Sequence, residues 1–191
     1  VNNRLRMMKA AEMAGGIDQV ADMMWLVPCK DGFDHHWKVN AVHGYAVLVP
    51  GCSLAKPQKR WPAKYFAAVG NDLLARGLTV YVVGTAEDHQ AIDCVLAEEP
   101  DIIDLCGKTN LAELARLLRG ASYVIGNDTG PVFLAAKTGA PTLMMMGPDT
   151  DPTMSAPIGT AVSWLRGNPI SSITVTAALS SLSDLSGSMK S

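Results

Sequence analysis

The residues best suited to chemistry lie in the hexapeptide Gly-Asn-Asp-Thr-Gly-Pro at positions 126–131. It follows an apolar, strand-like run at 122–125 and precedes a short helical pattern at 131–137. The first turn of a helix has free backbone N–H groups, so this segment could bind an anion such as phosphate. A carboxylate, Asp128, would be out of place in a site for phosphate alone, but it can accept hydrogen bonds from hydroxyls. The combination indicates a ligand with an anionic part and hydroxyl groups, as in a nucleotide-sugar.

A second polar segment could supply positive charge to the same ligand. It begins with Pro-Gly-Cys-Ser at 50–53 and reaches Lys59 shortly before a helix that starts near Pro62. Ser53 can donate to a phosphate oxygen, and Lys59 adds a cation near a helix N-terminus that already favours anions. By themselves, these residues also fit a basic surface loop.

Two carboxylates, Glu87 and Asp88, stand at the start of another predicted helix. Either could accept hydrogen bonds from ribose hydroxyls, and both would also serve as helix caps. The segment Gly-Lys-Thr-Asn at 107–110 either touches the ligand or forms a turn in which Asn110 caps a helix. No P-loop pattern occurs. A G-x-G-x-x-G fingerprint is also absent, which argues against a nicotinamide dehydrogenase.

Nothing in the sequence indicates a metal site or a resident cofactor. The four cysteines include no C-x-x-C pair, so we expect free thiols. The adjacent residues His35 and His36 would point in different directions and make a poor metal pair. Asp149 and Asp151 form a D-x-D pattern, which we interpret as a loop before Pro152 because cationic side chains already supply the counter-charge.

The elements that must position these residues alternate regularly from residue 45 onward. Continuously apolar strands separated by helices predict a parallel sheet covered on both faces, with doubly wound, Rossmann-like connections. Ligands bind such α/β sheets at the carboxyl ends of the strands, where all the segments above lie. The expected strands are 45–49, 79–83, 102–106, 122–125, 141–146 and a weaker 161–165, and the expected helices are 62–76, 86–99, 111–119, 131–137 and 173–185.

Composition limits the possible partners. With 48% hydrophobic and 18% charged residues, the 191-residue chain has a globular composition. A net charge of −2 gives no electrostatic case for binding nucleic acid. No apolar run reaches the ~18 residues that a transmembrane helix needs. The first residues lack the apolar core of a secretion signal, so we expect a cytoplasmic protein, and the missing initial Met indicates a fragment.

Taken together, these segments resemble glycosyltransferase family 9, the ADP-heptose:lipopolysaccharide heptosyltransferases. The similar pieces occur in the family's order across about residues 45–165. They are 50–53 with 59–62, then 107–115, then 126–131 with Leu-Ala-Ala at 134–136, and finally Gly-Pro at 147–148.

The resemblance implies a GT-B architecture, in which two Rossmann-like domains enclose the active site. Residues 45–185 would be the C-terminal, donor-binding domain, followed by a tail at 186–191. Residues 1–44 would be the end of the N-terminal domain and the interdomain linker. The lipopolysaccharide core acceptor and the acidic general base would belong to the missing N-terminal domain, so this chain would be inactive alone. The full enzyme would work in the cytoplasm, at the inner face of the bacterial inner membrane.

The resemblance also implies an inverting, metal-independent transfer from ADP-heptose and a role for each motif residue. Lys59 would stabilise the departing nucleoside diphosphate. The remaining implied contacts place Ser53 and Lys59 on the diphosphate, Glu87 or Asp88 near the ribose, and Asp128, Thr129 and Gly130, with Pro131 at the helix start, around the diphosphate and sugar.

One position departs from the family pattern, since Phe133 stands where the family usually has His. An apolar ring there leaves the identity of the sugar open. Two alternatives to a glycosyltransferase also stay open. One is a GT-B-like nucleotide-sugar epimerase, which shares the donor half, and the other is a nucleotide-binding module without turnover.

Overall fold

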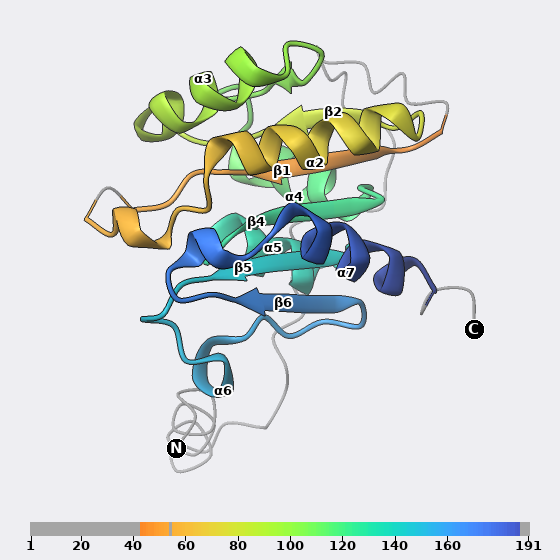
Figure 1. Ribbon diagram of the computed structural model, residues 1–191. Helices are drawn as coiled ribbons and strands as arrows, with labels where there is room; N and C mark the ends of the chain where they lie inside the picture. The colour runs from red at the N-terminus through yellow and green to blue at the C-terminus, as the bar shows by residue number, and fades with distance from the viewer. Residues whose placement is uncertain (1–42, 54, 188–191) are drawn as a thin grey trace, which may run out of the picture.

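The computed structural model describes residues 43–53 and 55–187. Their centre is a six-stranded sheet in the order β3-β2-β1-β4-β5-β6, with every neighbouring pair parallel (Figure 1). The predicted α/β, doubly wound, Rossmann-like fold is therefore confirmed. The strands are β1 (Tyr45–Val49), β2 (Thr79–Val82), β3 (Ile103–Asp104), β4 (Tyr123–Asn127), β5 (Thr142–Met146) and β6 (Val162–Arg166).

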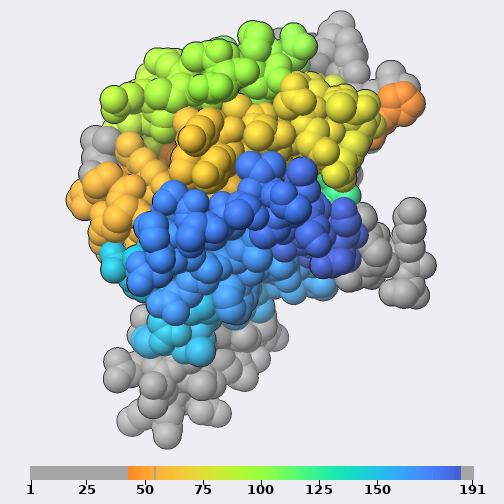
Figure 2. All heavy atoms as spheres, in the orientation of Figure 1, coloured from red at the N-terminus to blue at the C-terminus, as the bar shows by residue number. Residues whose placement is uncertain are grey.

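Helices cover both faces of this sheet. In Figure 1, α2, α3 and α7 lie in front of the sheet, and α4 and α5 lie behind it. Figure 2 shows the front face, where α2 (orange to yellow) lies between α3 (green) and α7 (blue). The long helices are α2 (Ala63–Ala75), α3 (His89–Glu98), α4 (Leu111–Arg119), α5 (Gly130–Lys137) and α7 (Val175–Gly187), and the short ones are η2 (Pro57–Lys59), η3 (Ala86–Asp88), α6 (Pro152–Ser155) and η4 (Ile170–Ser172).

The strands are apolar throughout because side chains alternate between two buried faces. In β5, Leu143 and Met145 join the cluster under α2, α3 and α7, whereas Met144 and Met146 join the cluster under α4 and α5. All four side chains are fully buried. The run of methionines is therefore core, and the site must be built at the ends of the strands.

Several element boundaries differ from the predicted ones for local reasons. The helix expected at 86–99 is divided into η3 and α3, because the Asp88 carboxylate accepts hydrogen bonds from the backbone N–H and hydroxyl of Thr85. The edge strand β3 has only two residues, and Asp104 Oδ1 accepts from the Cys106 N–H just after it. Helix α7 continues to Gly187, so the first two residues of the expected tail at 186–191 are helical.

The boundary at residue 44 and the histidine pair at 35–36 lie outside the residues that the structure describes, or at their limit. Within the described ranges, no helix combines the length and the hydropathy that crossing a bilayer requires. The same residues contain no group of three or more His, Cys, Asp or Glu side chains placed to hold a metal ion.

Candidate functional site

A cavity of about 270 Å³ opens at the carboxyl edge of the sheet, where the strand order reverses between β1 and β4. Such a reversal is the position at which open α/β sheets bind ligands. The cavity is lined by the ends of β1 and β2 and by the loops after β3 and β4. Five predicted site residues meet in its wall, namely Ser53, Glu87, Asp88, Thr129 and Pro131.

Two glycines let η3 approach the end of β1 closely enough to form this wall. A Cβ atom at Gly51 would collide with the carboxyl group of Asp88. A Cβ atom at Gly84 would lie 2.9 Å from Cβ of Asp88. The same Asp88 carboxylate caps η3 through Thr85, at 2.9 Å from its N–H. Of the two acidic residues, Glu87 is therefore the one whose exposed carboxylate has no hydrogen-bond or ion-pair partner among the described residues.

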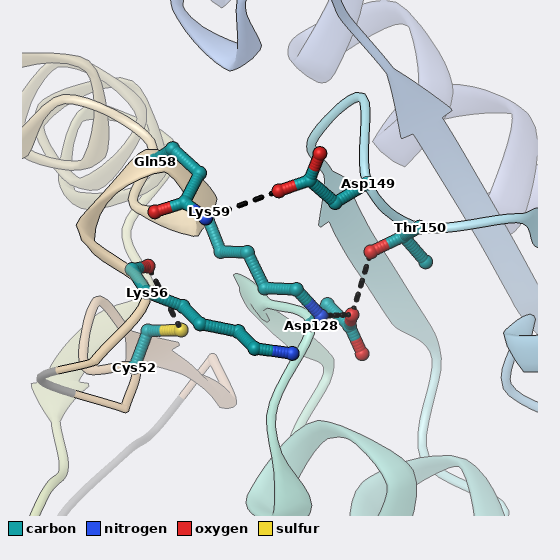
Figure 3. A network of polar contacts seen from close by, with 7 residues as sticks. All are labelled: Cys52, Lys56, Gln58, Lys59, Asp128, Asp149 and Thr150. Atoms are coloured by element: carbon teal, nitrogen blue, oxygen red, sulfur yellow. Dashed lines mark hydrogen bonds and ion pairs between the residues drawn. The ribbon is translucent and has the colours of Figure 1, made fainter.

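Lys59 and Asp128 lie beside this cavity and contact one another. Lys59 Nζ is 2.5 Å from Asp128 Oδ2, and the Thr150 hydroxyl donates to the same oxygen at 2.8 Å (Figure 3). The two charged side chains are only 15% and 10% exposed. Sequence reasoning placed Lys59 on a diphosphate and Asp128 on a sugar, but it did not anticipate that they form an ion pair.

Asn127 is a positioning residue that sequence reasoning missed. Its side chain is fully buried, accepting from the Trp61 N–H at 2.9 Å and donating to the Pro50 carbonyl at 2.8 Å. It thereby ties the end of β4 to both ends of the loop that carries Ser53 and Lys59. The only signal in the sequence was a buried-strand amide directly before Asp128.

The start of α5 has fewer free backbone N–H groups to offer an anion than the sequence indicated. The backbone N–H groups of Val132 and Phe133 both point to the Thr129 carbonyl, at 3.1 and 3.4 Å, and Pro131 has no N–H. In the first turn of α5, this leaves the N–H of Gly130 without an acceptor among the described residues. Gly130 is exposed, and an added Cβ would meet nothing within 4 Å.

Phe133 lines a second, apolar cavity of about 420 Å³ between α4 and α5. Leu111, which is 60% exposed, lies on the other side of it. Leu114 and Pro131 line both cavities, so the apolar groove adjoins the polar one. Of the segment at 107–110, Thr109 lines the polar cavity. Asn110 caps α4, which confirms the turn-and-cap interpretation for that residue, whereas contact of Thr109 with a ligand stays a prediction.

The thiol of Cys52 also lines the polar cavity and is 6% exposed. Burial raises its pKa, an effect that the positive charges of Lys59 and Arg60 oppose. The thiol is therefore protonated at neutral pH and is a neutral part of the wall. Cys52, Cys94 and Cys106 are all free.

A family model described as glycosyltransferase family 9 (heptosyltransferase) matches residues 6–177. The chain belongs to glycosyltransferase family 9. This confirms the resemblance found in the motifs at 50–62, 107–115, 126–136 and 147–148, which all lie within the matched range.

Curated relatives of this family 9 chain are heptosyltransferases. Lipooligosaccharide heptosyltransferase 2 of Haemophilus influenzae is 29% identical over 136 residues, which cover 68% of this chain and 39% of that protein. Lipopolysaccharide heptosyltransferase 1 of Salmonella typhimurium is 33% identical over 112 residues, covering 56% of this chain and 33% of the relative. The chain thus spans well under half the length of either relative.

Solved structures share the family 9 fold. The ADP-heptose lipopolysaccharide heptosyltransferase II of Escherichia coli superposes with a TM-score of 0.70 at 23% identity, over 78% of this chain and 49% of that one. The E. coli heptosyltransferase WaaC, solved with ADP, gives a TM-score of 0.70 at 22% identity, over 92% of this chain and 53% of the other. At these identities the likeness establishes the fold.

Proposed function

We propose that this chain is the donor-binding part of a heptosyltransferase that moves heptose from ADP-heptose to a lipopolysaccharide core acceptor. The observation that carries the proposal is the cavity at the strand-order reversal, with Ser53, Glu87 and Thr129 in its wall and the Lys59–Asp128 pair beside it. Hydroxyls, a free carboxylate and a cation suit a ligand that has ribose, diphosphate and sugar parts. The family and the fold both support this assignment.

In the proposed reaction, an acceptor hydroxyl attacks the anomeric carbon of the donor and ADP departs. Negative charge grows on the diphosphate as the bond to the sugar breaks. The ammonium group of Lys59 and the free N–H of Gly130 would stabilise that charge. Because these groups provide counter-charge, we propose that the transfer needs no metal ion. Because the acceptor displaces ADP in a single attack on the opposite face, we propose that the anomeric carbon is inverted.

Other residues of the cavity would bind the nucleoside and the sugar. Glu87 would accept from the ribose hydroxyls, whereas Asp88 would shape the wall from its place as the η3 cap. Asp128 would accept from a sugar hydroxyl, next to Thr129 and Gly130. The general base and the acceptor site would lie in a second Rossmann-like domain, so we expect no sugar transfer by this chain alone, and the complete enzyme would meet its acceptor at the inner membrane face.

Calorimetry with the 191-residue chain tests the proposal. ADP should bind, and ADP-heptose should bind more tightly because of the added sugar contacts. Asp128→Ala should reduce the affinity for ADP-heptose by roughly tenfold or more and the affinity for ADP by less, because a hydrogen bond to a charged group contributes about 1.5–3 kcal/mol.

Several outcomes would contradict the proposal. If neither ADP nor ADP-heptose binds at millimolar concentration, the chain is not a donor-binding domain. An equal loss of both affinities in Asp128→Ala would remove the assignment of this carboxylate to the sugar. Transfer of heptose by the chain alone would show that it carries its own base. Membership of a glycosyltransferase family favours transfer over epimerisation.

A further inference from the structure

We propose that Thr150 is a positioning residue of the donor site, whose hydroxyl orients the carboxylate of Asp128. In this arrangement Oδ2 holds Lys59 and Oδ1 is presented to a hydroxyl of the donor sugar. The inference rests on the proposed function and adds a residue from the loop after β5, which no sequence motif singled out for binding.

Two donors converge on one oxygen of the Asp128 carboxylate. Lys59 Nζ reaches Oδ2 from η2, and the Thr150 hydroxyl reaches the same atom at 2.8 Å (Figure 3). The other oxygen, Oδ1, accepts no hydrogen bond from the described residues, although the side chain is only 10% exposed. The carboxylate therefore has one satisfied oxygen and one that is available to a ligand.

The second donor matters because the carboxylate torsion of Asp has a broad, roughly two-fold energy profile. A single flexible lysine would leave the plane of the carboxylate free to rotate about the Cβ–Cγ bond. Thr150 is short, β-branched and only 3% exposed, so its hydroxyl is far better fixed than an ammonium group. We therefore assign the orientation of Oδ1 to Thr150 rather than to Lys59.

The backbone around Thr150 is itself held in place. Its N–H donates to the Gly147 carbonyl at 3.2 Å, which closes a turn directly after β5. Asp149 accepts from the Gln58 amide at 3.0 Å, which joins this loop to η2 next to Lys59 (Figure 3). A Cβ atom at Gly147 would lie 3.3 Å from the Gln58 carbonyl, so the two loops are in close contact. Three loops, after β1, β4 and β5, thus meet at Asp128.

The test compares Thr150→Val, which keeps the shape and loses the hydroxyl, with Thr150→Ser, which keeps the hydroxyl. The quantity measured by calorimetry is the ratio of the affinities for ADP-heptose and ADP. Thr150→Val should lower this ratio by roughly three- to tenfold, the range expected for one hydrogen bond. Thr150→Ser should leave the ratio close to that of the unmodified chain. Thr160→Val, at an exposed threonine before β6, is the matched control and should leave the ratio unchanged.

The outcomes separate this inference from the proposed function. If the unmodified chain binds ADP-heptose more tightly than ADP but the ratio is unchanged in Thr150→Val, the inference alone is wrong. The inference alone is also wrong if Thr150→Val lowers the affinities for ADP and ADP-heptose by the same factor, since equal losses indicate general loss of structure. If the unmodified chain binds neither ligand, the proposed function and this inference are both wrong.

Discussion

At the scale of single residues, the site depends on where side chains are missing as much as on where they are present. The hexapeptide at 126–131 contains two glycines with opposite surroundings. Gly126 is buried in β4, opposite Val49 of β1. Gly130 is exposed at the start of α5. At Gly126 the packing of the sheet leaves no room for a side chain. At Gly130 the space that a side chain would fill is open to a ligand.

Alanine at each glycine should therefore separate folding from binding. In Gly126→Ala, the new Cβ would lie 2.6 Å from Val132 Cγ2 and 2.7 Å from Val49 Cβ. The free energy of unfolding should fall by about 1–3 kcal/mol, as in other overpacked cores. Gly130→Ala should leave it unchanged or raise it by up to about 1 kcal/mol, because alanine favours a helix.

The effects on ADP affinity should have the reverse order, with the larger loss in Gly130→Ala. A methyl group at Gly130 would occupy the space beside the free N–H, so ADP affinity should fall by roughly tenfold, about 1.4 kcal/mol. Urea denaturation and calorimetry on the two variants provide both quantities. Unchanged ADP affinity in Gly130→Ala would show that the ligand does not approach α5.

At the scale of elements, α4 and α5, behind the sheet, contribute residues to both the polar and the apolar cavity. Helix α4 contributes Leu114 to both cavities, and its start is set by a reciprocal cap. Asn110 Oδ1 accepts from the Glu113 N–H at 3.0 Å, and Glu113 Oε2 accepts from the Asn110 N–H at 2.7 Å. This cap follows the turn at Gly107, whose φ of +66° is in the left-handed region that favours glycine.

Loss of this cap should destabilise the chain measurably. Asn110→Ala removes an acceptor for a helix N–H, and the expected decrease in the free energy of unfolding is about 1 kcal/mol. Asn110→Asp retains a capping oxygen and should cost much less. Urea denaturation of both variants checks this. Equal destabilisation by the two substitutions would mean that the amide group, rather than the cap, matters.

At the scale of the whole molecule, stability should depend on pH through a partly buried phenol, that of Tyr45, which joins the sheet to α4. Tyr45, at the start of β1, donates its hydroxyl to the Leu117 carbonyl at 2.8 Å. Its ring also lies edge-on to Tyr81, with centroids 5.6 Å apart. Burial, and then the neighbouring charge of an ionised Tyr81, raises the pKa of Tyr45 to about 12. The folded state thus disfavours the ionised form.

The raised pKa of Tyr45 determines whether stability rises or falls with pH. Below about pH 10 the phenol is protonated in both states, so its stabilising contribution is complete. Between about pH 10 and 12 the unfolded chain loses the proton while the folded chain retains it, so about 2–3 kcal/mol of stability should be lost. In Tyr45→Phe this part of the pH dependence should disappear. Urea denaturation from pH 8 to 12 measures it, and an unchanged slope in the variant would contradict the assignment.

Much of the fold was predictable because strand and helix periodicities are local properties of the sequence. The apolar runs and the cap at Asn110 each act over a few residues, and together they predicted the order of elements and the edge of the sheet where the candidate site lies. The hexapeptide, Ser53 and Glu87 were also identified from their neighbours in the chain. Boundaries such as the split at Asp88 were missed because side-chain hydrogen bonds decided them.

By itself, the sequence determined the parallel sheet, the family and the loops that form the site. Only the tertiary structure decided which side chains in those loops meet. Lys59 and Asp128 are far apart in sequence, and so are Asn127 and Trp61, yet each pair is in contact. Thr150 joins Asp128 only because β5 lies next to β4 in the sheet. Local sequence patterns cannot predict these contacts, because the contacts depend on strand order and on the packing of three separate loops.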